Sequence, residues 1–191
     1  MNLMMFPKMA ASHDEGWAWL MQVHPSVAKV FALYVAPMAL IPPAMLLYAV
    51  HAYGGIMGSV TMDHAWRLAI VFYLAELMAV PVMAAVIQRL GDVVDTRPEY
   101  HDAFAFAAAV PTPLWLSALA LFIPSLTVVA VATAVALFIS ALLIYEGCDR
   151  VFGLNDEGKS RLLAGSILAA GLVAWVVLMG LAFVSWGWAV S

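Results

Sequence analysis

The feature that most limits what this chain can fold into is a series of five long apolar stretches, four of which contain no charged residue. They cover residues 30–50, 66–90, 103–123, 126–145 and 162–188. A helix needs about 20 apolar residues to cross about 30 Å of hydrocarbon, and each stretch reaches that length. The pattern predicts an all-α, polytopic membrane protein, folded as a bundle of five transmembrane helices.

The composition supports the membrane class and excludes several others. Hydrophobic residues make up 65% of the chain and charged residues 10%, whereas a soluble domain has about 45–50% and about 25%. Cys148 is the sole cysteine, which excludes an intrachain disulfide and a Cys-rich metal site. A net charge of -4 argues against a nucleic-acid partner.

The first 27 residues differ from the rest because they are mixed in polarity and rich in Met. They contain one Lys and no long apolar core before His13, so they do not resemble a cleaved signal peptide. We predict a cytoplasmic N-terminal segment over residues 1–27, either loosely ordered or lying on the membrane surface. One five-helix transmembrane domain follows over residues 28–191.

The basic residues predict which way the bundle faces. Positions between the predicted spans place seven of the eight Lys and Arg residues on one side, with Arg67 alone on the other. Because cytoplasmic loops carry the excess of Lys and Arg, we expect a cytoplasmic N-terminus and a C-terminus outside. Trp66, Trp186 and Trp188 then fall at the outer interface. Ten of the twelve acids also fall on the cytoplasmic side, leaving Asp63 outside and Glu76 buried.

Three motifs occur in a fixed order along the chain. A Gly-containing turn, QRLG at 88–91, ends the second span. A short polar loop and a Tyr-initiated segment with prolines follow, with YHDAF at 100–104, VPTPLWL at 110–116 and LFIP at 121–124. The fourth span ends LLIYEG at 142–147. In these motifs the chain resembles the Yip1 family, in its bacterial branch, over roughly residues 30–184.

The resemblance implies five helices, a cytoplasmic N-terminus, a bacterial inner membrane location and no assigned enzymatic chemistry. Eukaryotic members act in vesicle traffic and bind lipid-modified small GTPases, partners that a bacterial chain would lack. Bacterial relatives often carry Leu-Pro after the glycine that ends the fourth span, where this chain has Cys148 and Asp149. We therefore do not transfer any shared site at that place.

Glu76 is the sharpest candidate for a functional residue. It lies about ten residues, or about 15 Å, into the second span, where a charge costs at least about 3 kcal/mol. It must be protonated or paired inside the bundle. One hypothesis is an intramembrane proton or cation relay, with Tyr73 on the same helical stripe as its polar partner. The alternative is a neutral carboxyl hydrogen-bonded to a carbonyl that Pro81 or a neighbouring helix leaves free.

The polar loop after the second span is a candidate metal site. Carboxylates and an imidazole suit Mg, Mn or Fe(II), although the spacing matches no defined motif. The alternative is a solvated turn in which Asp102 compensates the dipole of the third helix. The candidate ligands are Asp92, Asp95, Glu99, His101 and Asp102, with Glu146 and Cys148 from the end of the fourth span.

No constellation of catalytic residues is evident in the sequence, so we expect a protein that is not an enzyme. The sequence indicates no certain cofactor, and a divalent metal ion is the candidate. The favoured function is a membrane organiser or adaptor that contacts lipids, copies of itself or other membrane proteins. The alternative is a small oligomeric transporter or channel for a divalent cation or a proton-coupled solute. That function would use Glu76, the acidic cluster and helices broken by proline.

Overall fold

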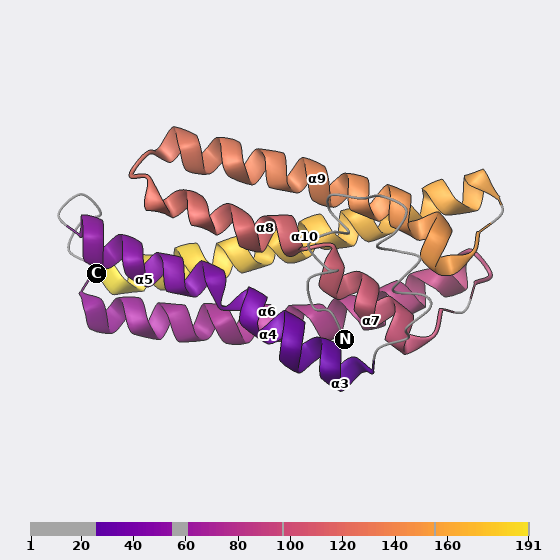
Figure 1. Ribbon diagram of the computed structural model, residues 1–191, viewed down its shortest axis with the longest axis horizontal. Coiled ribbons are helices and arrows are strands. Elements are labelled where there is room, and N and C mark those ends of the chain that lie inside the picture. The colour runs from indigo at the N-terminus through magenta and orange to yellow at the C-terminus, as the bar shows by residue number, and fades with distance from the viewer. Residues whose placement is uncertain (1–25, 55–60, 97, 155, 191) are drawn as a thin grey trace.

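Five helical segments run along the molecule in the computed structural model, and each is long and apolar enough to cross a bilayer (Figure 1). The structure describes residues 26–54, 61–96, 98–154 and 156–190, with side chains as far as Val184. Every regular element in those ranges is a helix. The spans are Val27–Tyr53, Met62–Val93, Tyr100–Phe122, Leu126–Phe152 and Glu157–Val184. The prediction of an all-α, five-span bundle is confirmed.

The first span is assembled from four short pieces because prolines interrupt its hydrogen bonding. These are α3 (Val27–Val30), the π-helix η1 (Phe31–Val35), α4 (Ala36–Ala39) and α5 (Ile41–Tyr53). Proline occupies the first turn of both α4 and α5, where its missing N–H has no helical partner to lose. The carbonyls of the preceding turn are left for neighbouring groups to cover.

The second span is one helix, α6 (Met62–Val93), which continues through Pro81. At its start the Thr61 side chain accepts a hydrogen bond from the His64 backbone N–H. At its end Asp95 has a left-handed backbone with φ 58°, and Thr96 N–H donates to the Gly91 carbonyl at 3.0 Å. These features form a Schellman cap, in which the left-handed residue is usually Gly and sometimes a short polar residue.

The third span also breaks at prolines, whereas the last two are continuous. It comprises α7 (Tyr100–Ala109), α8 (Thr112–Ser117) and the 3-10 helix η2 (Ala118–Phe122). The fourth is α9 (Leu126–Phe152), which begins after the N-cap Ser125 and ends at the left-handed Gly153. The fifth is α10 (Glu157–Val190).

The sequence predicts a polar loop at residues 146–161, between the fourth and fifth apolar stretches, and the structure shortens this loop. α9 continues to Phe152 and α10 begins at Glu157, so most of this polar segment is helical. Hydropathy marks where the hydrocarbon ends, and Glu and Arg are good helix formers that extend a helix beyond that point. The connection between the first two spans is shortened in the same way, because α5 reaches Tyr53 and α6 starts at Met62.

α7 forms the centre of the core. All seven residues at positions 103–109 are buried, and five of them are alanines, which allow helices to approach closely. The two aromatic residues pack outward onto neighbouring elements. The Phe104 ring lies 6.4 Å from that of Phe31 in η1, and the Phe106 ring lies 5.4 Å from that of Phe152 in α9, between centroids.

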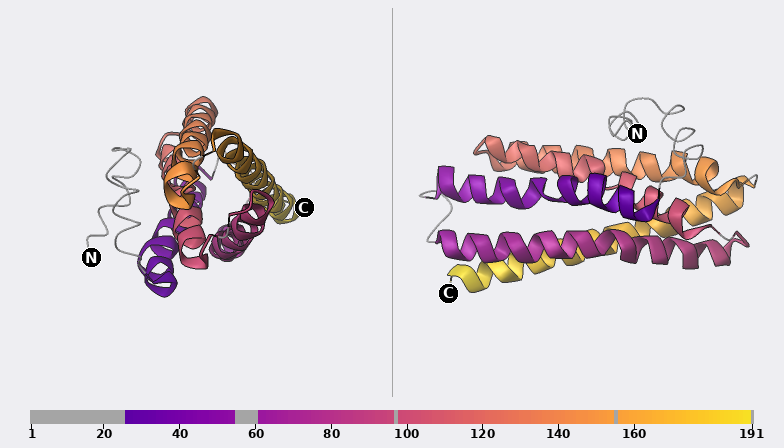
Figure 2. Two further views of the ribbon diagram at one scale, coloured as in Figure 1. Left: turned by 90° about the vertical axis from the view of Figure 1, so that its right-hand side faces the viewer. Right: turned by 60° about the horizontal axis from the view of Figure 1, so that its bottom comes forward.

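The faces of α6, α9 and α10 that point away from the core carry large exposed apolar side chains, including Met78, Phe138 and Phe183. Such side chains are expected on a surface in contact with lipid. α10 is the least embedded span, with only 6% of its most apolar 18-residue window buried. Viewed along the bundle, α6 and α10 lie side by side and α10 closes the side opposite α3 (Figure 2).

The charged residues gather at one end of the bundle. The α6–α7 and α9–α10 connections lie together at the right of Figure 1, whereas the ends of α5 and η2 lie at the left. Asp63 and Arg67 belong to the left end, at the start of α6. Trp66 is exposed there, whereas the side chains of Trp186 and Trp188 and the predicted N-terminal segment up to Pro25 lie outside the described residues.

Candidate functional site

A half-open cavity of about 740 Å³ lies among the five spans, and every span contributes to its lining. α6, α9 and α10 supply most of its walls, and α8 closes one side with Leu114 and Trp115. The lining is almost entirely apolar, with Phe72, Leu137 and Trp175 as typical members. A space of this size and character is typical of small-molecule sites, which measure about 300–1,000 Å³.

Glu76 is the acidic residue in this lining. It lies roughly 21 Å from the start of α6 and roughly 25 Å from its end, at 1.5 Å per residue, and so close to the middle of the helix. Its side chain is 7% exposed. The Trp115 side chain lies beside this carboxyl, while the Oε2 atom of Glu76 is buried without a hydrogen-bond partner among the described residues.

Tyr73, the predicted partner of Glu76, is engaged elsewhere. Its hydroxyl donates to the Ala36 carbonyl at 3.1 Å, which ties α6 to the broken first span. That carbonyl precedes Pro37, in the region where the helix changes from π to α geometry. A Tyr hydroxyl therefore covers this carbonyl of the broken first span, and the neutral Glu76 carboxyl bonded to a freed carbonyl stays a prediction.

Several other hydroxyls near the cavity bond within the protein. Ser140 of α9 donates to the Val110 carbonyl at 2.9 Å, and Ser117 donates to the Leu114 carbonyl at 2.7 Å. The hydroxyls of Tyr34 and Thr112 are 2.5 Å apart. Each bond stabilises the turn around Pro111 and Pro113, where the α7–α8 break interrupts regular backbone hydrogen bonding.

The acidic residues proposed as metal ligands are separated into several contacts. His101 Nδ1 lies 3.2 Å from Glu99 Oε2, and His101 Nε2 lies 2.9 Å from Asp102 Oδ1. Asp95 instead meets Lys159 at 3.0 Å. Asp92 is exposed in the last turn of α6.

The two ligands suggested from the fourth span do not complete a set. Cys148 is fully buried in the hydrophobic core, and Glu146 is half-buried on α9. Within the described ranges no three His, Cys, Asp or Glu side chains lie close enough to hold a metal ion. The metal site therefore stays a prediction without a converging set of ligands in this structure. His13, Asp14 and Glu15 lie outside the described residues.

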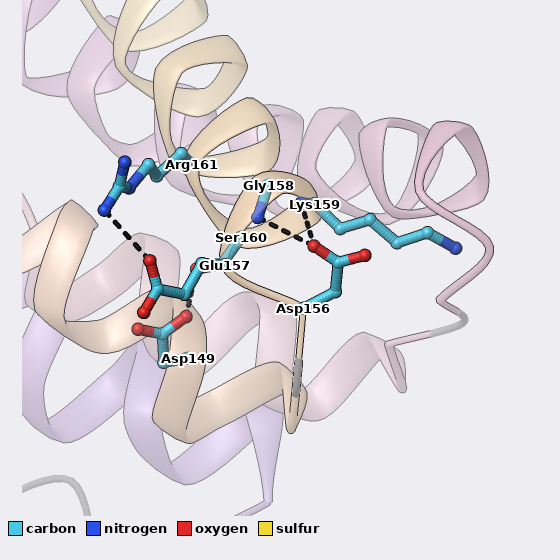
Figure 3. Close-up of polar contacts among 7 residues, drawn as sticks. All are labelled: Asp149, Asp156, Glu157, Gly158, Lys159, Ser160 and Arg161. Carbon is cyan, nitrogen blue, oxygen red and sulfur yellow. Dashed lines mark hydrogen bonds and ion pairs between the residues drawn. The ribbon is translucent and has the colours of Figure 1, made fainter.

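The α9–α10 connection contains polar contacts that sequence reasoning did not predict (Figure 3). Asp156 Oδ1 accepts hydrogen bonds from the backbone N–H groups of Gly158 and Lys159, at 2.8 and 3.3 Å, and so caps the start of α10. Ser160 donates to Asp149 across the connection. Of these contacts only the cap can be predicted from the sequence, since an Asp just before an apolar helix is a preferred N-cap.

Comparison with known proteins identifies the family. The Yip1 domain model matches residues 4–178, which is most of the chain. The chain belongs to the Yip1 family. The motifs around Gly91, Tyr100, Pro111 and Glu146 thus led to the correct family.

Among curated relatives, the chain is 35% identical over 122 residues to the inner membrane protein YohC of Escherichia coli strain K12, and equally to that of strain O6:H1. These matches cover 63% of this chain and 62% of the relative, so the chain spans less than two thirds of the relatives' length. No solved structure matches.

Proposed function

We propose that this Yip1 chain is a non-enzymatic organiser or adaptor in a bacterial inner membrane, with its contact surface at the charged end. The charged end is defined here as residues 89–102 and 146–161, which hold eight of the twelve acids and five of the eight basic residues. The gathering of these charges at one end of an otherwise apolar bundle is the observation that carries the proposal (Figure 1). The inner membrane location is supported by the relatives, which are inner membrane proteins of Escherichia coli.

The charged end has the properties of a contact surface for a basic partner. Its side chains include Glu99, which is 77% exposed, and Asp95, which is 85% exposed. The helices that form the charged end, α6, α9 and α10, continue beyond their apolar segments. Hydrogen bonds cap the end of α6 and the start of α10. A preorganised surface with excess negative charge attracts a basic partner and rejects an acidic one. In the proposed orientation this surface faces the cytoplasm, together with the N-terminus.

The test is affinity capture of the full chain from native membranes, with each recovered protein confirmed by reciprocal capture. Charge reversal by Asp92→Lys with Glu99→Lys should abolish recovery of the specific partners, and recovery from the unaltered chain should weaken as salt is raised. Arg67→Glu, at the opposite end, is the control and should leave recovery unchanged. Recovery of only further copies of the chain, or partners insensitive to the reversal, would contradict the proposal.

A second candidate function is transport, which the position of Glu76 in the cavity favours. A carboxyl at this depth can carry a proton with a solute, and five spans would need a homo-oligomer to form equal halves. The cavity is less suited to a divalent cation. Mg and Ca take six or more oxygen ligands, whereas one carboxyl lines the described cavity. Solute-driven proton uptake into proteoliposomes that Glu76→Gln abolishes would establish this second function.

A further inference from the structure

We propose that the cavity between α6, α8, α9 and α10 is a binding site for a lipophilic amine. In this site an apolar body fills the cavity, and a single protonated amine pairs with the carboxyl of Glu76. This inference goes beyond the adaptor function, because it concerns the interior of the bundle and not the charged end. It also differs from the transport candidate, since it requires binding and no net movement of solute.

The size and lining of the cavity determine the chemical character of the larger part of the ligand. About 740 Å³ of space is bordered by apolar residues such as Phe72, Leu137 and Leu172. Burial of apolar surface in such a lining stabilises a ligand by roughly 25 cal/mol per Å². A small hydrated ion or sugar would exchange its water for hydrocarbon and lose hydrogen bonds. The occupant must therefore be mostly hydrocarbon.

The hydrogen bonds of the lining set the polar group of the ligand. The hydroxyls of Ser117 and Ser140 already donate to protein carbonyls, Thr133 supplies the third hydroxyl of the lining, and Trp115 is the group beside Glu76. The Glu76 Oε2 atom remains buried with no partner in the described part of the chain. The site thus offers an acceptor, and the complementary ligand group is a donor.

Charge selects an amine among the possible donors. The described lining contains no Lys, Arg or His, so an anionic ligand would meet a carboxyl and no cation. A protonated amine instead forms a charge-assisted hydrogen bond with the carboxylate, which is roughly twice as strong as a neutral one. The pair is neutral as a whole, which removes the large cost of an isolated charge in hydrocarbon.

A membrane phospholipid fits the site less well than an amine. Its acyl chains would fill apolar space, but its donors and charges belong to a headgroup at the membrane surface. Glu76 lies near the middle of α6, more than 20 Å of helix from either end by the rise per residue. A lipid chain therefore leaves Oε2 without a partner, and a lipophilic amine provides one.

The test is photocrosslinking of the purified full chain in nanodiscs with an alkyl-diazirine amine. The matched probes are the alcohol, the carboxylic acid and the hydrocarbon with the same chain. The amine probe should label peptides of α6, α9 and α10 saturably, and excess dodecylamine should displace it. Dodecanoic acid should not compete.

Three variants locate the site. Glu76→Gln keeps the side-chain shape and should weaken dodecylamine competition at least about tenfold, which corresponds to about 1.4 kcal/mol. Gly171 lines the cavity and nothing lies within 4 Å of a Cβ built there, so Gly171→Leu should fill part of the cavity and block labelling while leaving Glu76 intact. Gly180→Leu on the lipid-facing side of α10, where a Cβ also meets nothing, is the matched control and should label normally.

The competing outcomes each overturn the proposal. If all four probes label the same peptides equally and Glu76→Gln changes nothing, membrane hydrocarbon fills the cavity without selection. If the acid competes as well as the amine, the charge argument is wrong. If no saturable labelling occurs in a chain that elutes as a single folded species, there is no site. Thermal melting of each variant shows whether lost labelling reflects lost folding.

Discussion

Tyr73 forms a hydrogen bond between the continuous second span and the broken first one. Its hydroxyl covers the Ala36 carbonyl, beside a proline that interrupts the first span. In hydrocarbon an uncovered carbonyl has no water to replace the lost donor. The contribution of Tyr73 is therefore to the geometry of the bundle, whatever proton chemistry Glu76 performs.

We expect Tyr73→Phe to lower the free energy of unfolding by about 1 kcal/mol, the typical contribution of one hydrogen bond. Unfolding by a denaturing detergent, followed by circular dichroism, measures the change. Tyr145→Phe is the control, because the Tyr145 hydroxyl makes no hydrogen bond with any residue that the structure describes and its side chain is 44% exposed. Equal effects of the two substitutions would show that the bond to Ala36 contributes nothing.

The sequence identified Glu76 because an acid stands out in an apolar stretch. It could not identify Trp115 or Ser140, because one aromatic or one hydroxyl in an apolar helix looks the same whether it faces lipid, core or cavity. Tyr73 is predicted as a partner because it shares a helical stripe with Glu76, and in this structure its hydroxyl donates to the Ala36 carbonyl. Partners 30 or more positions away depend on how helices rotate against one another, which hydropathy does not report.

At the scale of helices, the sequence predicted the number and order of the spans but placed several of their ends too early. Asp95 illustrates why the site residues were harder. Its neighbours in sequence predict a metal ligand, and in the structure its left-handed backbone ends α6. Short acidic side chains tolerate that conformation. An Asp near a helix end can therefore be interpreted either as a metal ligand or as the residue that ends the helix. Spacing alone does not separate them.

Gly91 and Pro98 form a close contact where α6 turns toward α7. A Cβ added at Gly91 would lie 2.6 Å from Pro98 Cδ, so Gly91→Ala should destabilise the protein by about 1–3 kcal/mol through overpacking. Pro98→Ala removes the ring, and the double variant should then lose less stability than the sum of the single variants. A double-mutant cycle of unfolding free energies measures this coupling.

Additive effects in that cycle would contradict the contact. Gly180→Ala provides the helix-propensity control, since Gly180 is a helical glycine with open space around it. There the substitution should be neutral or stabilising by about 0.5–1 kcal/mol. The contrast between the two glycines isolates the effect of Pro98 from the general preference of helices for Ala.

The molecule as a whole is divided into a charged end and an apolar body, and this division predicts its orientation in the membrane. The basic residues of the α6–α7 and α9–α10 connections favour the cytoplasm. A reporter active only outside the cytoplasm should therefore give signal when fused to Ser191 and none when inserted within residues 92–98. A cytoplasmic reporter at the same two positions is the control and should give the opposite pattern. The reverse result would overturn the orientation.

The length of α10 has a mechanical consequence. Residues 162–190 contain no charged residue, and a helix of that length measures about 43 Å, against about 30 Å of hydrocarbon. A helix with this hydrophobic mismatch tilts to shorten its projection across the bilayer. Because α10 is the least buried span, it can tilt with less disturbance than its neighbours. The thickness of the surrounding bilayer therefore acts first on α10, the same helix that forms one wall of the cavity around Glu76.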